Sequence, residues 1–143
     1  MSVTVDANVL VYASNESDAS HARAKAIVQE LGAGPRLVYI FWPVVLAYLR
    51  IATHPAILPR PLTSAEAQAN VDQLIVRPHV RTSGELDGFW ALLRGAAGHN
   101  ARGNEFPDVQ LVALMRQHGV ETIYTRDRDF RRYADITVRD PFA

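Results

Sequence analysis

Short apolar runs alternate with helical stretches along the whole chain, and this alternation is what most restricts its fold. Five runs have the length and composition of strands, at residues 2–5, 37–40, 80–82, 121–125 and 136–138. The run at 37–40, Leu-Val-Tyr-Ile, is apolar throughout, as is typical of a strand covered on both faces. Strands separated by helices predict an α/β fold with a parallel sheet and right-handed crossovers. No repeat or linker divides the chain, so we expect one domain over residues 1–143.

The helical stretches are predicted from apolar spacing and from signals at their ends. They cover residues 17–31, 43–53, 63–75, 86–97 and 107–118, and a further helix begins near residue 9. Pro43 and Pro107 suit the first turn of a helix, where a proline loses no hydrogen bond. Thr63 and Glu66 have the spacing of a capping box. Four aromatic side chains are expected in the core: Phe41, Trp42, Phe89 and Trp90.

Charge and cysteine content exclude several classes of function. The chain carries 15 basic and 15 acidic side chains, so any binding of a polyanion depends on local arginines. Cysteine is absent, which excludes disulfide frameworks, thiolate catalysis and cysteine zinc sites. The longest apolar run, residues 37–49, is too short to span a membrane, and the N-terminus lacks the basic flank of a signal peptide. We therefore expect a cytoplasmic protein.

Three aspartates stand at the ends of predicted elements. Asp6 follows the first strand and Asp127 follows the fourth, while Asp108 lies in the first turn of the last long helix. Because the functional crevice of an open α/β sheet lies at the carboxyl ends of its strands, the three are expected to converge there. Like charges brought together need a counter-charge, and hard divalent cations prefer carboxylate oxygen. A cation held in this way can catalyse phosphodiester hydrolysis.

Each of these acids also has an ordinary structural explanation. A strand-terminal aspartate such as Asp6 often only forms a turn or caps a helix. An acid at Asp108 interacts favourably with the helix dipole, typically by about 0.3–1 kcal/mol, without any other role. Asp127 could simply cap the turn that follows it. The interpretation as a metal site therefore depends on the three acids meeting in space.

Several neighbours are candidates for supporting roles. Asn8 either positions an oxygen of Asp6 or caps the following helix. Glu105 is either a further ligand or a solvated acid, and Asp129 is better explained as a turn cap or as a partner of an arginine. The arginines expected to contact substrate phosphates are Arg50, Arg126 and Arg128.

Four segments taken together resemble the PIN-domain family, and in particular the VapC toxins of type II toxin–antitoxin pairs. The segments are Val-Asp-Ala-Asn-Val-Leu-Val-Tyr-Ala at 5–13, Trp-Pro-Val-Val-Leu-Ala-Tyr-Leu-Arg-Ile-Ala-Thr-His-Pro at 42–55, Asn-Glu-Phe-Pro-Asp-Val-Gln-Leu-Val-Ala-Leu at 104–114 and Thr-Arg-Asp-Arg-Asp-Phe at 125–130. The resemblance implies a three-layer α/β/α fold with a five-stranded parallel sheet in the order 3-2-1-4-5. It also implies an endoribonuclease that uses Mg²⁺, or Mn²⁺ in its place. Asp6, Asp108 and Asp127 would bind the metal, supported by Asn8 and Asp129.

The same resemblance implies partners. The substrate would be a structured RNA such as tRNA or rRNA, and a VapB-like antitoxin would cover the crevice. Family members similar to this one form homodimers, for which the apolar helix around 43–53 is a plausible face. A phosphotransfer domain is disfavoured, because it would need a late lysine and Lys25 is the only lysine of the chain.

One position departs from the family pattern. Many PIN nucleases carry a glutamate three residues before an arginine in the helix at 43–53, where this chain has Ala47 before Arg50. A second metal ion would then bind weakly, arrive only with the substrate phosphate, or be held partly by Glu105. The alternative is a PIN-like module that binds antitoxin or RNA without cleaving it.

Overall fold

A parallel five-stranded sheet forms the centre of the computed structural model, which describes residues 1–143. The strand order is β3-β2-β1-β4-β5, as predicted. The strands are β1 (Ser2–Val5), β2 (Leu37–Phe41), β3 (Val80–Ser83), β4 (Thr122–Tyr124) and β5 (Thr137–Arg139). The central strand β1 pairs with β2 and β4, so that Val3 lies between Val38 and Thr122. All carboxyl ends therefore lie at one edge of the sheet.

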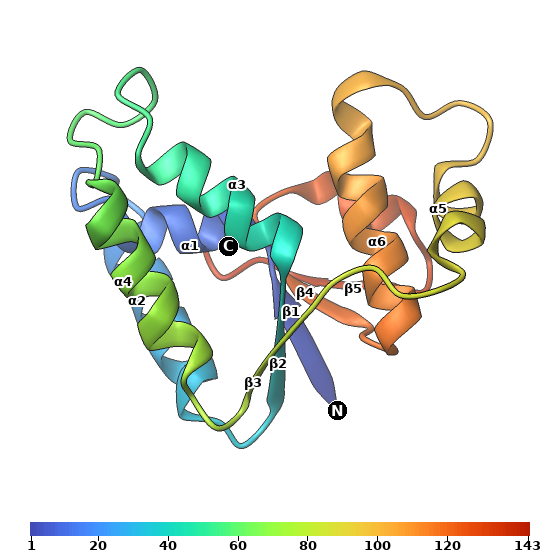
Figure 1. The fold of residues 1–143 in the computed structure, drawn as a ribbon, viewed down its shortest axis with the longest axis horizontal. Helices are drawn as coiled ribbons and strands as arrows, with labels where there is room; N and C mark the ends of the chain where they lie inside the picture. The colour runs from blue at the N-terminus through green and yellow to red at the C-terminus, as the bar shows by residue number, and fades with distance from the viewer.

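Helices cover both faces of this sheet and complete the predicted three layers. They are α1 (Ala7–Ser14), α2 (His21–Ala33), α3 (Trp42–Ala52), α4 (Ser64–Ile75), α5 (Phe89–Ala97) and α6 (Phe106–His118), with short 3-10 helices η1 (Gly103–Glu105) and η2 (Arg128–Arg132). In Figure 1, α1 to α4 lie to the left of the sheet, and α5 and α6 lie to its right. None of these helices has both the length and the apolar character that crossing a bilayer demands.

Two helices begin later than predicted. The α2 helix starts at His21 rather than at residue 17, because the side chains of Asn15 and Asp18 accept backbone N–H groups and form turns instead. The α5 helix starts at Phe89 rather than at residue 86, since Gly88 has a φ of 84° and lies in the left-handed region. The predicted capping box at the start of α4 is confirmed.

The core lies between the sheet and the helices and comprises 29 buried hydrophobic residues. Phe41 is fully buried, as predicted. The prediction for the two tryptophans is wrong, because Trp42 is 44% exposed and Trp90 is 67% exposed. Trp42 opens α3 at the edge of the sheet, and Trp90 lies on α5, which buries only Ala96 fully. Neither indole is therefore available to fill the core.

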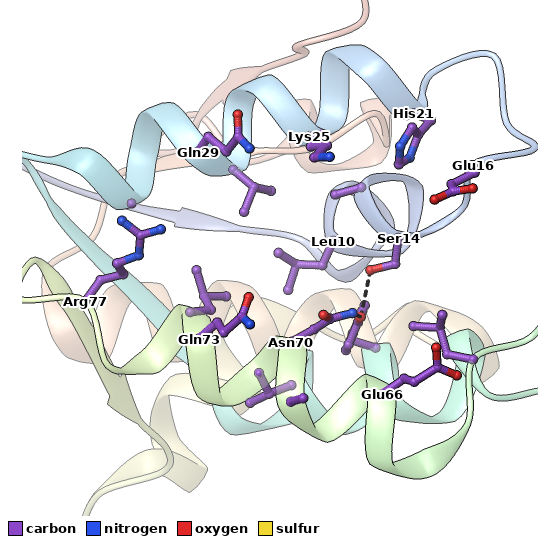
Figure 2. A pocket seen from close by; sticks show the side chains of 18 residues that line it. Leu10, Ser14, Glu16, His21, Lys25, Gln29, Glu66, Asn70, Gln73 and Arg77 are labelled. Atoms are coloured by element: carbon purple, nitrogen blue, oxygen red, sulfur yellow. Dashed lines mark hydrogen bonds between the residues drawn. The ribbon is translucent and has the colours of Figure 1, made fainter.

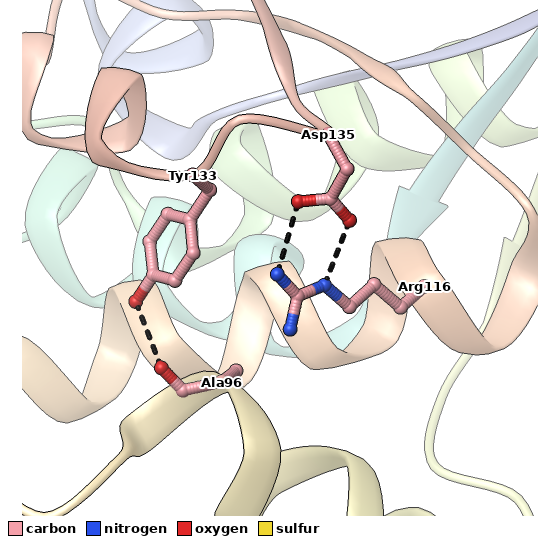
Figure 3. Close-up of polar contacts among 4 residues, drawn as sticks. All are labelled: Ala96, Arg116, Tyr133 and Asp135. Carbon is pink, nitrogen blue, oxygen red and sulfur yellow. Dashed lines mark hydrogen bonds and ion pairs between the residues drawn. The ribbon is translucent and has the colours of Figure 1, made fainter.

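An ion pair ties α6 to the segment that leads into β5. Arg116 donates to both carboxylate oxygens of Asp135, from Nε at 2.9 Å and from Nη2 at 3.0 Å. The Tyr133 hydroxyl donates to the carbonyl of Ala96 at 3.4 Å, which adds a link to α5 (Figure 3). Exposed pairs of this kind contribute little stability, typically about 0–1 kcal/mol. Their effect here is to hold the end of the segment 125–136 against the helices.

A candidate metal centre at the carboxyl edge of the sheet

The register of the central strands places Asp6 beside Thr125. Val5 of β1 pairs with Tyr124 of β4, so the next residue of each strand leaves the sheet at the same level. The backbone N–H of Asp6 donates to the carbonyl of Tyr124 at 3.0 Å and continues the pairing. A parallel pairing thus brings together two residues that are 119 positions apart in sequence.

A network of hydrogen bonds then fixes the Asp6 carboxylate. One oxygen accepts the backbone N–H of Ala7 at 2.8 Å and caps α1. The other oxygen accepts the Thr125 hydroxyl at 2.8 Å and the Asn8 amide at 3.3 Å. Asp6 therefore has the structural role that its position suggested, and Asn8 holds its oxygen. Capping α1 does not prevent Asp6 from binding a cation, because a hydrogen-bonded carboxylate keeps further lone pairs.

Thr125 is the residue that the sequence reasoning missed. Its side chain is fully buried, and its hydroxyl also accepts the Asn8 amide at 3.1 Å and the backbone N–H of Asp127 at 3.0 Å. The hydroxyl thus links the first acid of the site to the last. The available signal was a hydroxyl residue immediately after a strand and two positions before an aspartate, a common turn pattern.

Three carboxylates from two separate segments meet next to this network. Asp108, Asp127 and Asp129 each offer an oxygen such that the three oxygens lie within 4.8 Å of one another. Asp108 comes from the first turn of α6, whereas Asp127 caps η2 by accepting the backbone N–H of Asp129 at 2.9 Å. Asp6 lies outside this 4.8 Å group but lines the same cavity as Asp108. The predicted convergence therefore joins two strand ends and one helix start.

Burial and neighbouring negative charge raise the pKa of two acids at this edge, Asp108 and Asp6. Burial, followed by the negative charges of Asp127, Asp6 and Asp129, raises the pKa of Asp108 from 3.8 to about 7. Burial also raises the pKa of Asp6, although its hydrogen bonds with Thr125 and Ala7 partly oppose this. A divalent cation bound here would neutralise the repulsion between the carboxylates and favour their ionised form.

The remaining predicted residues are distributed unevenly around the site. Glu105 accepts the backbone N–H of Arg102 at 3.3 Å and is not part of the acid group. The Arg126 side chain lies between two aromatic rings, 4.7 Å from the centroid of Tyr12 and 4.3 Å from that of Phe142. Arg50, Arg126 and Arg128 are all exposed, but only Arg126 has its guanidinium engaged with these two rings, one of which belongs to the C-terminal segment.

A cavity of about 510 Å³ opens beside the acids. Asp6 and Asp108 line it from the sheet edge and from α6, and Arg50 lines it from α3. Ala47 lines it too, so the position where many PIN nucleases carry a fourth acid faces the same space without a carboxylate. The cavity thus combines carboxylates with one arginine.

A second cavity, of about 560 Å³, lies among α1, α2 and α4 and holds none of these acids (Figure 2). Its walls carry Lys25 on α2, Arg77 at one end, and Glu16 and Glu66 near the other end, with the Ser14 hydroxyl 2.7 Å from that of Tyr48. Although it is slightly larger, it lacks the clustered carboxylates. The chemistry of the molecule is therefore expected at the smaller cavity.

Loss of the Asp108 carboxylate is expected to stabilise the metal-free protein at high pH. Between about pH 3.8 and pH 7 the folded protein keeps a proton on Asp108 that the unfolded chain has released. Stability attributable to this group therefore falls as pH rises through that range. We expect Asp108→Asn to have the higher melting temperature in EDTA above pH 7, with the difference vanishing toward pH 4. Thermal unfolding of both proteins across this pH range measures the difference. The same dependence of melting temperature on pH in both proteins would contradict the prediction.

Removal of the Thr125 hydroxyl is expected to weaken the site and the fold together. Thr125→Val keeps the shape but removes the acceptor of the Asp127 N–H and the hydroxyl that donates to Asp6, and leaves the Asn8 amide with Asp6 as its remaining acceptor. The expected cost is about 1–3 kcal/mol of unfolding free energy. Thr125→Ser, which retains the hydroxyl, is the control and should lose much less. Denaturant unfolding of the two variants decides it, and equal losses would show that the methyl group matters instead.

Comparison with known proteins gives consistent matches over the whole chain. The family model of the PIN domain matches residues 3–136. The chain is 49% identical to Ribonuclease VapC48 of Mycobacterium tuberculosis, over all of this chain and 99% of that protein. The structure of Mycobacterium tuberculosis VapC20, a Sarcin-Ricin loop cleaving toxin, has a TM-score of 0.66 at 22% identity and covers 96% of this chain and 99% of that one. VapBC2 from Rickettsia felis, bound to a DNA fragment from their promoter, has a TM-score of 0.63 at 18% identity and covers 97% and 98%. These two structures show the fold alone.

Proposed function

The chain belongs to the PIN-domain family, and from that premise we propose that it is the toxin of a type II toxin–antitoxin pair, an endoribonuclease that requires Mg²⁺. The observation that carries this proposal is the group formed by Asp108, Asp127 and Asp129, with Asp6 lining the same cavity as Asp108 and linked to Asp127 through the Thr125 hydroxyl. Residues 1–143 would act as a single domain. The ribonuclease that is 49% identical over its length supports the same reaction.

The residues at the site suit a hard cation. Three clustered carboxylates with a proton held near neutral pH are a donor set for Mg²⁺, with Mn²⁺ able to replace it. Asp6, Asp108 and Asp127 would hold the ion, and Asp129 would complete or orient the group. When bound, the ion supplies an activated water and neutralises charge on the phosphate. Asn8 and Thr125 keep the Asp6 carboxylate in place.

The substrate of this proposed activity is RNA. Arg50 lies in the same cavity as the acids, and Arg128 is exposed beside Asp127, so both are placed to contact phosphates that flank the cleavage site. Such contacts make binding weaken as salt rises. A tRNA or rRNA is the expected target, while the VapC20 toxin is described as cleaving the Sarcin-Ricin loop.

An antitoxin is the expected partner, since uncontrolled RNA cleavage harms the cell that makes the enzyme. The related VapBC2 structure is of a pair bound to its promoter DNA, which supports a small DNA-binding protein in this role. It would cover the cavity in the cytoplasm and block the acids. A homodimer is also expected, with α3 as its face, because Leu46 on that helix is 65% exposed.

Controlled expression in a bacterial host tests the toxin function. Induction of the chain alone should arrest growth and yield discrete RNA fragments, and co-expression of the small protein encoded beside it should restore growth. Asp108→Asn should not arrest growth. Growth arrest without RNA fragments would instead favour a module that binds RNA or antitoxin without cleaving. This alternative follows from Ala47, which stands in the cavity where many PIN nucleases carry an acid.

A carboxylate introduced at position 47 is expected to strengthen metal binding. Ala47 lines the cavity that Asp6 and Asp108 also line, so Ala47→Glu would supply the fourth acid of many PIN nucleases. Half-maximal cleavage should then need several-fold less Mg²⁺. Ala65→Glu is the control, because it makes the same substitution at an exposed position of α4 that does not line this cavity. Titration of Mg²⁺ in a cleavage assay measures it, and equal requirements for both variants would contradict it.

A further inference from the structure

A tryptophan lies exposed in the cavity that holds the acids. Trp42 is 44% exposed and lines this cavity together with Asp6, Asp108 and Arg50. It follows β2 directly and is the first residue of α3, so it stands at the same edge of the sheet as Asp6. Large aromatic side chains normally stabilise a fold by burying their apolar surface. Its exposure beside a reactive site therefore points to a ligand.

The indole is supported by neighbouring structure. A Cβ atom added to Gly84 would lie 3.2 Å from Cδ1 of Trp42, so the loop after β3 packs against the edge of the ring. The His118 ring is hydrogen-bonded to that loop, with Nε2 at 3.0 Å from the Gly84 carbonyl and 3.2 Å from the Ser83 hydroxyl. His118 in turn packs against Phe41, with 5.3 Å between ring centroids. The indole is thus held ready, which lowers the entropic cost of binding.

The ligand that fits this combination is an unpaired nucleotide. An aromatic ring stacks on any base, and an arginine beside it binds the backbone phosphate. The cavity, at about 510 Å³, has the size of a pocket for one small ligand. It therefore suits a single splayed nucleotide better than a duplex, whose bases are already stacked.

We propose that Trp42 stacks on an unpaired base next to the phosphate that is cleaved, while Arg50 contacts a neighbouring phosphate. The proposal rests on the ribonuclease function argued above and adds a positioning residue to it. Trp42 would select RNA that is single-stranded at the cleavage site. It would do so through binding, without taking part in bond making or breaking.

Fluorescence measures the contact independently of cleavage. Trp90, the other tryptophan, lies on α5 and does not line the cavity, so Trp90→Phe leaves Trp42 as the only indole. In a protein that also carries Asp108→Asn, a short single-stranded RNA of mixed sequence should quench this fluorescence, and the matching duplex should not. No difference between the two RNAs would overturn the proposal.

Substitutions at position 42 separate stacking from packing. Trp42→Leu keeps apolar bulk but removes the aromatic face, and should weaken binding of the single-stranded RNA by about 5- to 100-fold. Trp42→Phe should retain most of the affinity, and Trp90→Leu should change nothing. In cleavage assays the loss should appear mainly in KM rather than in kcat. An effect of Trp42→Leu no larger than that of Trp90→Leu would overturn the proposal.

Two further outcomes are distinguishable. If the single-stranded RNA quenches Trp42 but is never cleaved, the stacking proposal holds and the nuclease function fails. If Trp42→Leu leaves RNA affinity intact but turns a dimer into a monomer in light scattering, the indole contacts a second copy of this chain and the stacking proposal fails.

Discussion

Replacing Asp108 or Asp6 by asparagine is expected to abolish RNA cleavage without unfolding the protein. Each substitution removes one carboxylate from the group that would hold Mg²⁺. A catalytic metal supplies several kcal/mol of transition-state stabilisation, and each 1.4 kcal/mol is tenfold in rate. Cleavage should therefore fall by at least about 100-fold for either variant. The assay uses purified protein, Mg²⁺ and total cellular RNA.

The matched control for this experiment is Asp72→Asn. Asp72 is an exposed aspartate of α4 that belongs neither to the acid group nor to the cavity beside it, so the Asp72→Asn variant should cleave like wild type. Asp108→Asn should at the same time melt at a higher temperature than wild type in EDTA at high pH, because it removes a charge that is partly buried and lies near other acids. Loss of activity with gain of stability separates a damaged site from a damaged fold. Activity retained by both Asp6→Asn and Asp108→Asn would refute the proposed site.

Truncation of Phe130 is expected to cause a large loss of stability. Its side chain is fully buried, and it is the one buried residue of η2, the turn that carries Asp127 and Asp129. Phe130→Ala should cost about 3–5 kcal/mol of unfolding free energy through lost burial and a residual cavity. Denaturant unfolding measures this cost, and Phe130→Leu, which keeps most of the volume, should lose much less.

The same substitution connects the core to the site. Because Phe130 anchors the turn from below, its truncation should also raise the Mg²⁺ concentration needed for cleavage by the protein that remains folded. A loss below about 1 kcal/mol would mean that η2 is held by other contacts. The anchor is then the Asp127 cap and the Arg116–Asp135 pair rather than the buried ring.

The fold was accessible from the sequence because it depends mainly on local patterns. The all-apolar run at 37–40 and the β-branched run at 2–5 predicted buried parallel strands, and both strands are present. Prolines and a capping box located the starts of three helices. The late starts of α2 and α5 were not predicted, since they depend on side-chain turns and on a single glycine conformation.

The site was predictable only where strand ends alone decide positions. The placement of Asp6 and Asp127 at one edge follows from the rule that strand carboxyl ends share that edge, and Asp108 follows from its place at the start of the helix that leads into β4. Thr125 was missed because its role arises from the register between β1 and β4. The engagement of Arg126 by Tyr12 and Phe142 was also hidden, since it joins three segments that are distant in sequence.

The exposure of Trp42 shows a different limit. Aromatic residues next to an apolar strand are usually buried, and Phe41 follows that pattern. Whether the next residue is covered depends on which segment packs over the start of α3, and there the loop at Gly84 reaches only the edge of the ring. Burial at an element boundary is thus a property of tertiary packing and cannot be read from composition.

Metal-dependent cleavage of RNA by the purified wild-type chain, freed of antitoxin, tests the central claim most directly. The protein is incubated with total cellular RNA in EDTA and then with Mg²⁺ in excess. The account predicts intact RNA in EDTA and discrete fragments once Mg²⁺ is restored. Intact RNA under both conditions, from folded protein, would contradict it, as would fragments that appear equally in EDTA.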